Sequence, residues 1–206
     1  MAEDHTLPQL MCVRTRFTAL NNAGAMTGTP YVTAALISLK ATPNVTEGDK
    51  IEEKSAAGSV CASYQAPNTT NWYDVELQVC TPDPRLRAML TGGTVLSDTP
   101  RSGYAAPALG AVDIATAPAV SIEAWALRIN AGSPDTDSPY AWIALPKVTS
   151  IVDTGGLELS NTAQKPTFSA KAYENSAWGS VDFPVAYDRV WQWIPCTAAD
   201  VPTATV

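Results

Sequence analysis

One stretch of the chain, residues 58–93, constrains the fold more than any other, because it reads as strand, turn, strand and helix in close succession. The second of these strands has apolar side chains at the odd positions Tyr73, Val75, Leu77 and Val79. The even positions hold Trp72, Asp74, Glu76 and Gln78. A period of two places the first set on a buried face and most of the second towards water. Residues 66–71 are turn formers, so we expect the two strands to pair as a hairpin.

A short amphipathic helix is predicted directly after this strand. Asp83 is suited to cap it and Pro84 to occupy its first position, where the missing N–H costs nothing. Gly92 provides a left-handed stop. The positions i, i+3 and i+4 on one face are apolar, namely Leu86, Met89 and Leu90. We expect these three residues to pack the helix against the sheets.

The remaining segments predict more strands and no second helix. Strand-like patterns occur in residues 7–20, 31–42, 120–130, 140–152, 157–173 and 190–195, whereas residues 93–118 read as an irregular crossing. We therefore expect a mainly β fold, a β-sandwich or barrel of two packed sheets with one short flanking helix. At 206 residues the chain is expected to form a single domain, residues 1–206, with frayed tails at 1–6 and 197–206.

The charge balance argues against attachment to nucleic acid. The net charge is −7 and the sequence pI about 4.6, so the chain lacks the positive charge that holds DNA by counterion release. Only 16% of the residues are charged, below the usual share of about a quarter for soluble proteins. A surface with so few charges hints at burial against copies of the chain or other partners.

Residues that commonly act in catalysis or bind metals are scarce, and we expect neither an enzyme nor a bound cofactor or metal. The four cysteines are widely spaced and the only histidine is His5, which disfavours zinc sites and histidine-activated nucleophiles. Asp74 and Glu76 share a strand face as a glycosidase pair would, but same-face acids are far more often solvated. The chain starts with acidic and polar residues rather than a signal-peptide pattern. No apolar run reaches the ~18 residues of a membrane span.

Residues 42–57 form a charged excursion between two predicted strands. Loops longer than about 12–15 residues without structure of their own are usually functional or disordered. We expect this loop to be poorly ordered in an isolated subunit and to become ordered on assembly. The residues that would make its contacts are Thr46, Glu47, Asp49, Lys50, Glu52, Glu53 and Lys54.

Several stretches in the same order resemble the major tail tube protein of long, non-contractile tailed bacteriophages, especially those of actinobacterial hosts. In the first half these are YVTAALISLKATPNVTEGDKI, GSVCASY, NWYDVELQVC and TPDPRLRAMLTG. In the second half they are IEAWALRI, YAWIALPKV, FSAKAYENSAWG and VWQWIPC. The resemblance covers most of the chain except residues 93–118 and the two ends, and it rests on order and spacing rather than on any single motif.

The resemblance implies a structural virion protein. In that family two packed sheets with one helix form hexameric rings, whose sheets join into an inner barrel, and the rings stack into a tube through which double-stranded DNA passes without specific binding. It implies a place in the virion tail, assembly in the host bacterial cytoplasm, and contact with the tape measure and other tail proteins. Residues 42–57 match the family's loop to the adjacent ring. The acidic balance suits a DNA-repelling lumen, and we expect Asp74, Glu76 and Gln78 to face it.

Two other functions remain open on the sequence. Another phage ring protein, a head–tail connector or tail terminator, would share the ring symmetry. A secreted carbohydrate-binding β-sandwich would use some of the six tryptophans to stack on sugars. Trp125 and Trp142, which have apolar neighbours, are expected in the core instead.

Overall fold

The computed structural model describes residues 9–80, 83–98, 101–108, 110, 117–130, 133–156, 164–180, 182–183 and 189–204. In this part of the chain the protein is mainly β, as predicted, with one short α-helix, α1 (Pro84–Thr91), and a turn of 3-10 helix, Ala198–Asp200. The predicted N-terminal tail, residues 1–6, lies outside the described residues.

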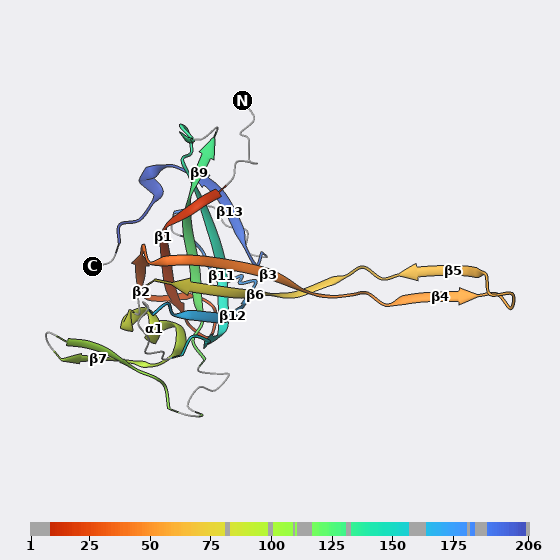
Figure 1. The fold of residues 1–206 in the computed structure, drawn as a ribbon, viewed down its shortest axis with the longest axis horizontal. Coiled ribbons are helices and arrows are strands. Elements are labelled where there is room, and N and C mark those ends of the chain that lie inside the picture. Colours follow the sequence, from red (N-terminus) through yellow and green to blue (C-terminus); the bar gives the residue numbers. More distant parts are fainter. Residues whose placement is uncertain are drawn as a thin grey trace.

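Thirteen strands are described, and the printed sequence can be followed through them in Figure 1. The first six are β1 (Gln9–Leu20), β2 (Met26–Thr33), β3 (Leu36–Thr46), β4 (Lys50–Lys54), β5 (Val60–Gln65) and β6 (Thr69–Val79). After α1 come β7 (Thr94–Asp98), β8 (Arg101–Ala105), β9 (Val120–Asn130), β10 (Ser133–Pro134), β11 (Tyr140–Asp153), β12 (Thr167–Tyr173) and β13 (Gln192–Cys196). Residues 93–118, expected to be irregular, therefore contain a hairpin, β7–β8.

Nine strands form one antiparallel sheet, and the long strand β11 organises it. The order is β2-β1-β9-β11-β12-β6-β3, with β10 added to β9 and β13 to β11. One edge of β11 pairs with β9. Its other edge pairs with β13 over residues 140–144 and with β12 over residues 147–153. The hairpins β4–β5 and β7–β8 are separate two-stranded sheets.

This architecture differs from the expected pair of packed sheets. Figure 1 shows β3, β6 and β12 crossing β1, β9 and β11, yet all of them belong to one continuous sheet. The reason is that β11 is 14 residues long and has a register shift between Thr149 and Val152, so both groups of strands join it. Among the described strands no ladder links the edge strands β2 and β3, so the sheet is not closed into a barrel.

The sheet bends around a core on one face. Its buried members come from four central strands, from β1 and from α1, namely Phe17, Val75, Leu77, Val79, Leu86, Leu90, Val120, Ile122, Leu145, Val148, Phe168 and Ala172. The edge strands also contribute, because Tyr31 of β2 and Leu36 and Leu39 of β3 pack against this cluster. The buried odd positions of β6 confirm the period of two read from the sequence, with Tyr73 half-buried at the start of the row.

Helix α1 has the ends that the sequence predicts. Asp83 Oδ1 accepts hydrogen bonds from the backbone N–H groups of Arg85 (2.7 Å) and Leu86 (3.1 Å), and Pro84 is the first helical residue. Gly92 ends the helix in the left-handed region with φ of 76°. Leu86 and Leu90 are buried in the core, and Met89 is half-buried against it. The helix therefore covers part of the core with the apolar face that the spacing indicated.

The opposite face of the sheet has a second cluster, which the segment after β12 covers. Trp125, Trp142 and Trp178 are its largest members, and Trp142 stacks on Trp178 at 6.2 Å and on Phe183 at 4.5 Å between ring centroids. Asn175 holds the segment in place, because its Nδ2 donates to the Gly24 carbonyl at 2.8 Å and to a carbonyl of β11. The burial of Trp125 and Trp142 confirms the prediction that they belong to the core.

A charged network is buried beneath this covering segment. The Arg16 guanidinium donates two hydrogen bonds to the carboxylate of Glu123, at 2.6 and 2.7 Å, and a third to Asp182 at 2.9 Å. Glu123 also accepts from Trp142 Nε1 at 3.2 Å. Arg16 and Glu123 are opposite each other on β1 and β9, which explains how they meet. The sequence pattern did not indicate this pair.

The C-terminal residues are more structured than the frayed tail expected for 197–206. Thr197 caps the 3-10 turn, and its backbone N–H and hydroxyl both donate to Asp200 Oδ2 at 2.8 Å. Val201 packs against the second cluster. Residues 205 and 206 lie outside the described part.

Candidate functional site

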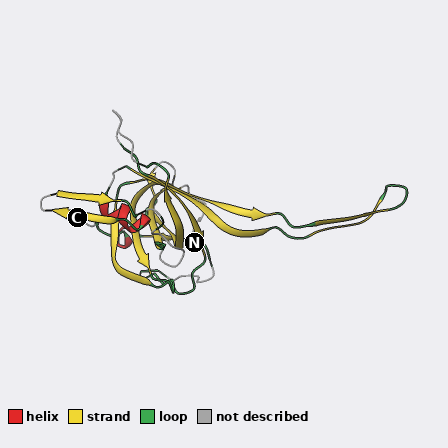
Figure 2. Cartoon of the chain, turned by 90° about the horizontal axis from the view of Figure 1, so that it is seen from below, coloured by secondary structure: helices red, strands yellow, loops and turns green. Residues whose placement is uncertain are grey.

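The most conspicuous feature is a two-stranded arm, residues 47–68, that projects from the body in Figures 1 and 2. It takes the place of the predicted charged loop, and it is a regular hairpin rather than an irregular excursion. Strand β3 extends to Thr46, opposite Thr69 of β6, and the arm continues in the same direction as β4 and β5. The predicted hairpin between β5 and β6 is therefore wrong, because β5 pairs with β4.

Local hydrogen bonds explain why the chain passes straight through residues 66–71 and turns back elsewhere. Ala66 N donates to Asp49 O at 2.9 Å, and Gly48 N donates to the Asn68 side chain at 3.1 Å, so the two strands stay together there. A Cβ on Gly48 would lie 2.0 Å from Ala66 O, which requires glycine at this crossing. The reversal lies at the arm's end, where Gly58 has φ of 83° and donates to Ser55 O.

The predicted loop residues all lie on this arm or at its base. Thr46 ends β3, Glu47 and Asp49 lie between the strands, and Lys50, Glu52, Glu53 and Lys54 are on β4. Along one face Glu52 pairs with Lys50 at 2.8 Å and with Lys54 at 3.5 Å. Exposed ion pairs of this kind contribute little stability, so they add little to the stability of the arm.

The other face of the arm carries apolar side chains. Ile51 and Tyr64 are directly opposite each other on β4 and β5, and they are 61% and 62% exposed. Ala62 lies on the same face, opposite Glu53. The sequence interpretation missed Tyr64 because it considered charge alone. The alternation in KIEEK and VCASYQ was the signal that could have found it.

The outer face of β6 is polar, and its charges are balanced by its neighbours. Asp74 and Glu76 are exposed and Gln78 is half-buried. Lys171 of β12 lies opposite Asp74, and Lys40 of β3 lies opposite Glu76. These two lysines offset the two acids, so the face itself is not strongly acidic, contrary to what the three residues suggest alone.

Apolar side chains gather where β3 runs past β1. They lie at a groove of about 630 Å³, which is lined by residues of β3, β1, β9 and β11. The large exposed apolar residues at this groove are Met11, Ile37 and Trp191. The outer edge of β3 lies beside them, since among the described strands β3 pairs with β6 alone. Among the described residues, this groove and the arm are two places where several large apolar side chains are exposed.

The described residues offer little for catalysis. Burial, with a smaller contribution from the Asp200 carboxylate, raises the pKa of the Cys196 thiol to about 11, and burial likewise raises the pKa of Cys12. Cys61 and Cys80 are exposed, and His5 lies outside the described part. No cluster of three metal-ligating side chains occurs among the residues that the structure describes. None of the described helices is long and apolar enough to span a membrane.

Stacking surfaces for sugars are limited as well. Trp125, Trp142 and Trp178 are buried. The ring of Trp72 is covered by Lys171 Nζ, 4.2 Å from its centroid, and its Nε1 donates to Asp74 at 2.9 Å. These contacts leave Trp191 as the exposed tryptophan of the described chain.

Comparison with protein families and curated proteins identifies no family for this chain. No protein-family model matches the chain, and no curated protein matches it either.

Proposed function

We propose that this protein is a structural subunit of a bacteriophage tail, which forms hexameric rings that stack into a tube for genome delivery. The observation that carries the proposal is the arm, which projects from the body with both of its opposed large apolar side chains mostly exposed. A lone two-stranded hairpin is marginally stable in water, so an arm of this length needs a partner. The resemblance of the sequence to tail tube proteins supports the same conclusion.

The free sheet edges support ring formation. Strands β2 and β3 end the sheet on its two sides, and unpaired edges tend to pair with another chain unless they are protected. In a ring, the edge of one subunit would join that of the next, giving the inner barrel of the tail-tube fold. The apolar groove beside β3 would then be covered by the neighbouring subunit.

The tube would carry DNA without binding it. We propose that the outer face of β6, with Asp74, Glu76 and Gln78, lines the lumen. A polar wall on which carboxylates and lysines balance has no excess positive charge to retain phosphates. The protein would be assembled in the host bacterial cytoplasm and located in the virion tail. The tape measure and other tail proteins would be its partners, and its role would be structural rather than enzymatic.

The alternatives are separated by what the purified protein assembles into. A head–tail connector or tail terminator would stop at a single ring, whereas a tube protein forms long stacks. A secreted carbohydrate-binding domain would stay monomeric, and the burial of three tryptophans already counts against it.

Removing the arm is expected to stop growth at single rings. Thr46 and Thr69 are cross-strand partners, so an Asn-Gly type I′ turn can replace residues 47–68 and close the hairpin without strain. Negative-stain electron microscopy of the concentrated wild-type protein should show tubes, and the shortened variant should show rings. Strictly monomeric wild-type protein in scattering measurements, together with its absence from virion tails, would refute the proposal. Normal tubes from the variant would show that the arm is not needed.

Reversing the charge of the β6 face is expected to make the genome adhere to the tube. Asp74→Lys with Glu76→Lys would join Lys40 and Lys171 to form a basic band repeated in every subunit. DNA ejection from virions with this double change should be slower, and higher salt should restore it, because phosphate contacts weaken as salt rises. The neutral pair Asp74→Asn and Glu76→Gln is the matched control. An unchanged ejection rate in the lysine variant would place this face outside the lumen.

A further inference from the structure

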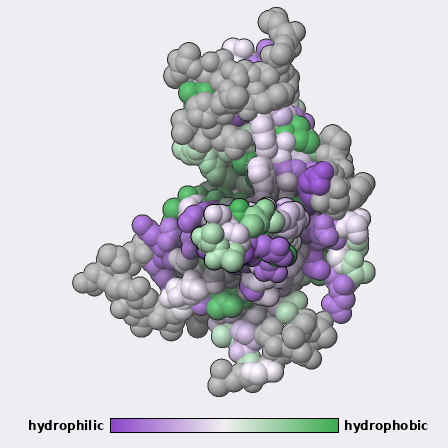
Figure 3. Space-filling view, turned by 90° about the vertical axis from the view of Figure 1, so that its right-hand side faces the viewer, coloured by the Kyte–Doolittle hydropathy of each residue, from purple (hydrophilic) through white to green (hydrophobic). Residues whose placement is uncertain are grey.

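The apolar face of the arm is mostly exposed in the described part of the chain. Ile51, Tyr64 and Ala62 share this face with the carboxylate of Glu53, whereas the ion pairs of Glu52 lie on the other one. Figure 3, which looks onto the end of the arm, shows hydrophobic and hydrophilic residues side by side on it. At about 3.3 Å per residue the nine steps from Thr46 to Ser55 span roughly 30 Å, about the diameter of a small domain. An arm of this reach carries its apolar face well away from its own body.

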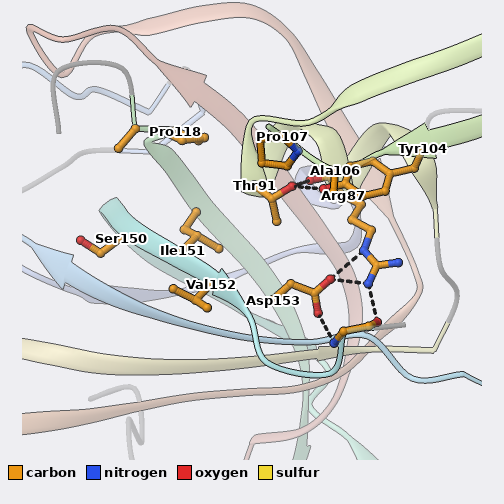
Figure 4. A pocket seen from close by; sticks show the side chains of 12 residues that line it. Arg87, Thr91, Tyr104, Ala106, Pro107, Pro118, Ser150, Ile151, Val152 and Asp153 are labelled. Carbon is orange, nitrogen blue, oxygen red and sulfur yellow. Dashed lines mark hydrogen bonds and ion pairs between the residues drawn. The ribbon is translucent and has the colours of Figure 1, made fainter. Parts of the chain in front are cut away.

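A groove of matching character opens beneath α1. It has a volume of about 800 Å³ and lies between α1 with the β7–β8 hairpin and the end of β11 (Figure 4). Its apolar lining consists of Ala106, Pro107, Ala117, Pro118, Ile151 and Val152. The bulge in β11, with Ser150 at φ of 54°, turns Val152 outwards, where it is exposed. The strand is therefore shaped to present an apolar side chain to the groove.

The side chains of Arg87, Asp153, Thr91 and Tyr104, which line this groove beside its apolar residues, already have hydrogen-bond partners. Arg87 is held by the Asp153 carboxylate and donates to Gly156 O at 2.7 Å. The hydroxyls of Thr91 and Tyr104 are hydrogen-bonded to each other at 2.6 Å. An incoming apolar side chain would therefore leave these four side chains with their partners, which favours its burial.

The arm and the groove are on opposite sides of the body. In Figures 1 and 2 the arm leaves on one side, whereas α1 and the β7–β8 hairpin, which border the groove, lie on the other. A chain cannot reach its own groove with this arm, but a second copy placed along the arm's direction presents its groove to it. Head-to-tail contacts of this kind repeat from copy to copy, and they build filaments when the repeat does not close into a ring.

Charge favours the same pairing. The arm has four carboxylates, Glu47, Asp49, Glu52 and Glu53, against two lysines, Lys50 and Lys54. The groove and the adjoining hollow, which share Ala117 and Ser150, are lined by Arg87 and Lys147 with Asp153 as the one acid. Because Arg87 and Asp153 pair with each other, the positive excess near the negative arm would come from Lys147 in the adjoining hollow.

We propose that the apolar face of the arm of one copy binds the groove beneath α1 of a second copy, with Tyr64 as the side chain that enters it. That the second copy belongs to the next ring of a tube rests on the proposed function; the contact between copies does not. A rigid aromatic side chain that fills an apolar pocket is the usual form of a dominant contact at protein interfaces.

Photo-crosslinking from position 64 tests the contact directly. Tyr64 is replaced by benzoylphenylalanine in unlabelled protein, which is mixed with nitrogen-15-labelled protein and irradiated, and crosslinked peptides are identified by mass spectrometry. We expect links from one copy to residues 104–107, 117–118 or 150–153 of another. The matched control places the same photoreactive residue at Gln65, on the opposite face of the arm, and should not label the groove.

Two substitutions measure the strength of the contact. Tyr64→Ala on the arm and Val152→Asp in the groove should each raise the protein concentration needed for polymer formation roughly tenfold or more. Gln65→Ala should leave it within about twofold. Circular dichroism and thermal unfolding show whether each variant remains folded, and a variant that unfolds is replaced by Tyr64→Ser or Val152→Ser.

The possible outcomes separate this inference from the proposed function. Polymers with links to the groove support both. Polymers whose links map to the groove beside β3, or nowhere, refute the docking site and leave the tube proposal intact. Links to the groove between copies at high concentration, without polymers, support the docking site and refute the tube. Absence of both polymers and links refutes both.

Discussion

Replacing Arg16 with methionine is expected to lower the free energy of unfolding by about 3–5 kcal/mol, the usual cost of removing one partner from a buried ion pair. Arg16 makes two hydrogen bonds to Glu123, which is only 1% exposed, and one to Asp182 at the surface. Without the guanidinium the Glu123 carboxylate would remain buried with neutral donors only. Denaturant unfolding followed by tryptophan fluorescence measures the change, because Trp125 and Trp142 report on this cluster.

The relative losses of stability expected for related variants make this prediction specific. Glu123→Gln should cost less than Arg16→Met, because Arg16 is more exposed and keeps Asp182 as its partner. The amide oxygen can still accept from Trp142 Nε1, so the double variant Arg16→Met with Glu123→Gln should recover part of the loss. Arg85→Met, at an exposed arginine of α1, is the control and should change the stability by about 0.5 kcal/mol at most. A loss below about 1 kcal/mol for Arg16→Met would show that the buried pair does not stabilise the fold.

Truncating Leu90 to alanine is expected to cost about 2–5 kcal/mol. Leu90 is 1% exposed at the end of α1, where it contributes to the core on the inner face of the sheet. The loss combines the apolar surface no longer buried with the cavity left between helix and sheet. Chemical unfolding of the folded monomer or ring gives the difference in free energy.

Leu96→Ala is the matched control for this prediction. Leu96 lies on β7, only six residues further along the chain, and is 54% exposed. Its truncation should cost about 0.5 kcal/mol or less, since little packing is lost. Equal losses for the two leucines would contradict the packing of α1 against the core.

The local elements could be predicted where neighbouring residues alone decide them. The helix ends follow from Asp83, Pro84 and Gly92, whose effects on backbone geometry act within a few residues. The faces of β6 follow from alternation, because the side chains of any strand point to opposite sides. The core tryptophans in β9 and β11 were likewise indicated by their apolar neighbours.

Strand pairing could not be predicted in the same way. Alternation assigns side chains to faces but does not say which edge pairs with which strand. Residues 66–71 look like a turn, yet Asn68 and Ala66 instead bond to Gly48 and Asp49 across the arm. The chain reverses at Gly58 instead, so β5 pairs with β4.

The candidate site was likewise predictable in its local features but not in its long-range contacts. The sequence marked residues 42–57 as a distinct charged segment, and this segment contains the first strand of the arm, β4. Its apolar face depends on Ile51 meeting Tyr64 across the ladder, 13 positions away in the sequence. The groove beneath α1 is assembled from residues of the helix, the β7–β8 hairpin and the end of β11. Only the folded chain brings those residues together.

The sequence by itself determined the mainly β class, the capped helix with its apolar face, and the two faces of β6, because each depends on geometry that repeats over a few residues. Tertiary structure alone decided that β11 joins all nine strands into one sheet, that Arg16 is buried against Glu123, and that the charged excursion is an arm. These features depend on contacts between residues far apart in the chain, such as Arg16 and Glu123, and local patterns carry no information about such partners.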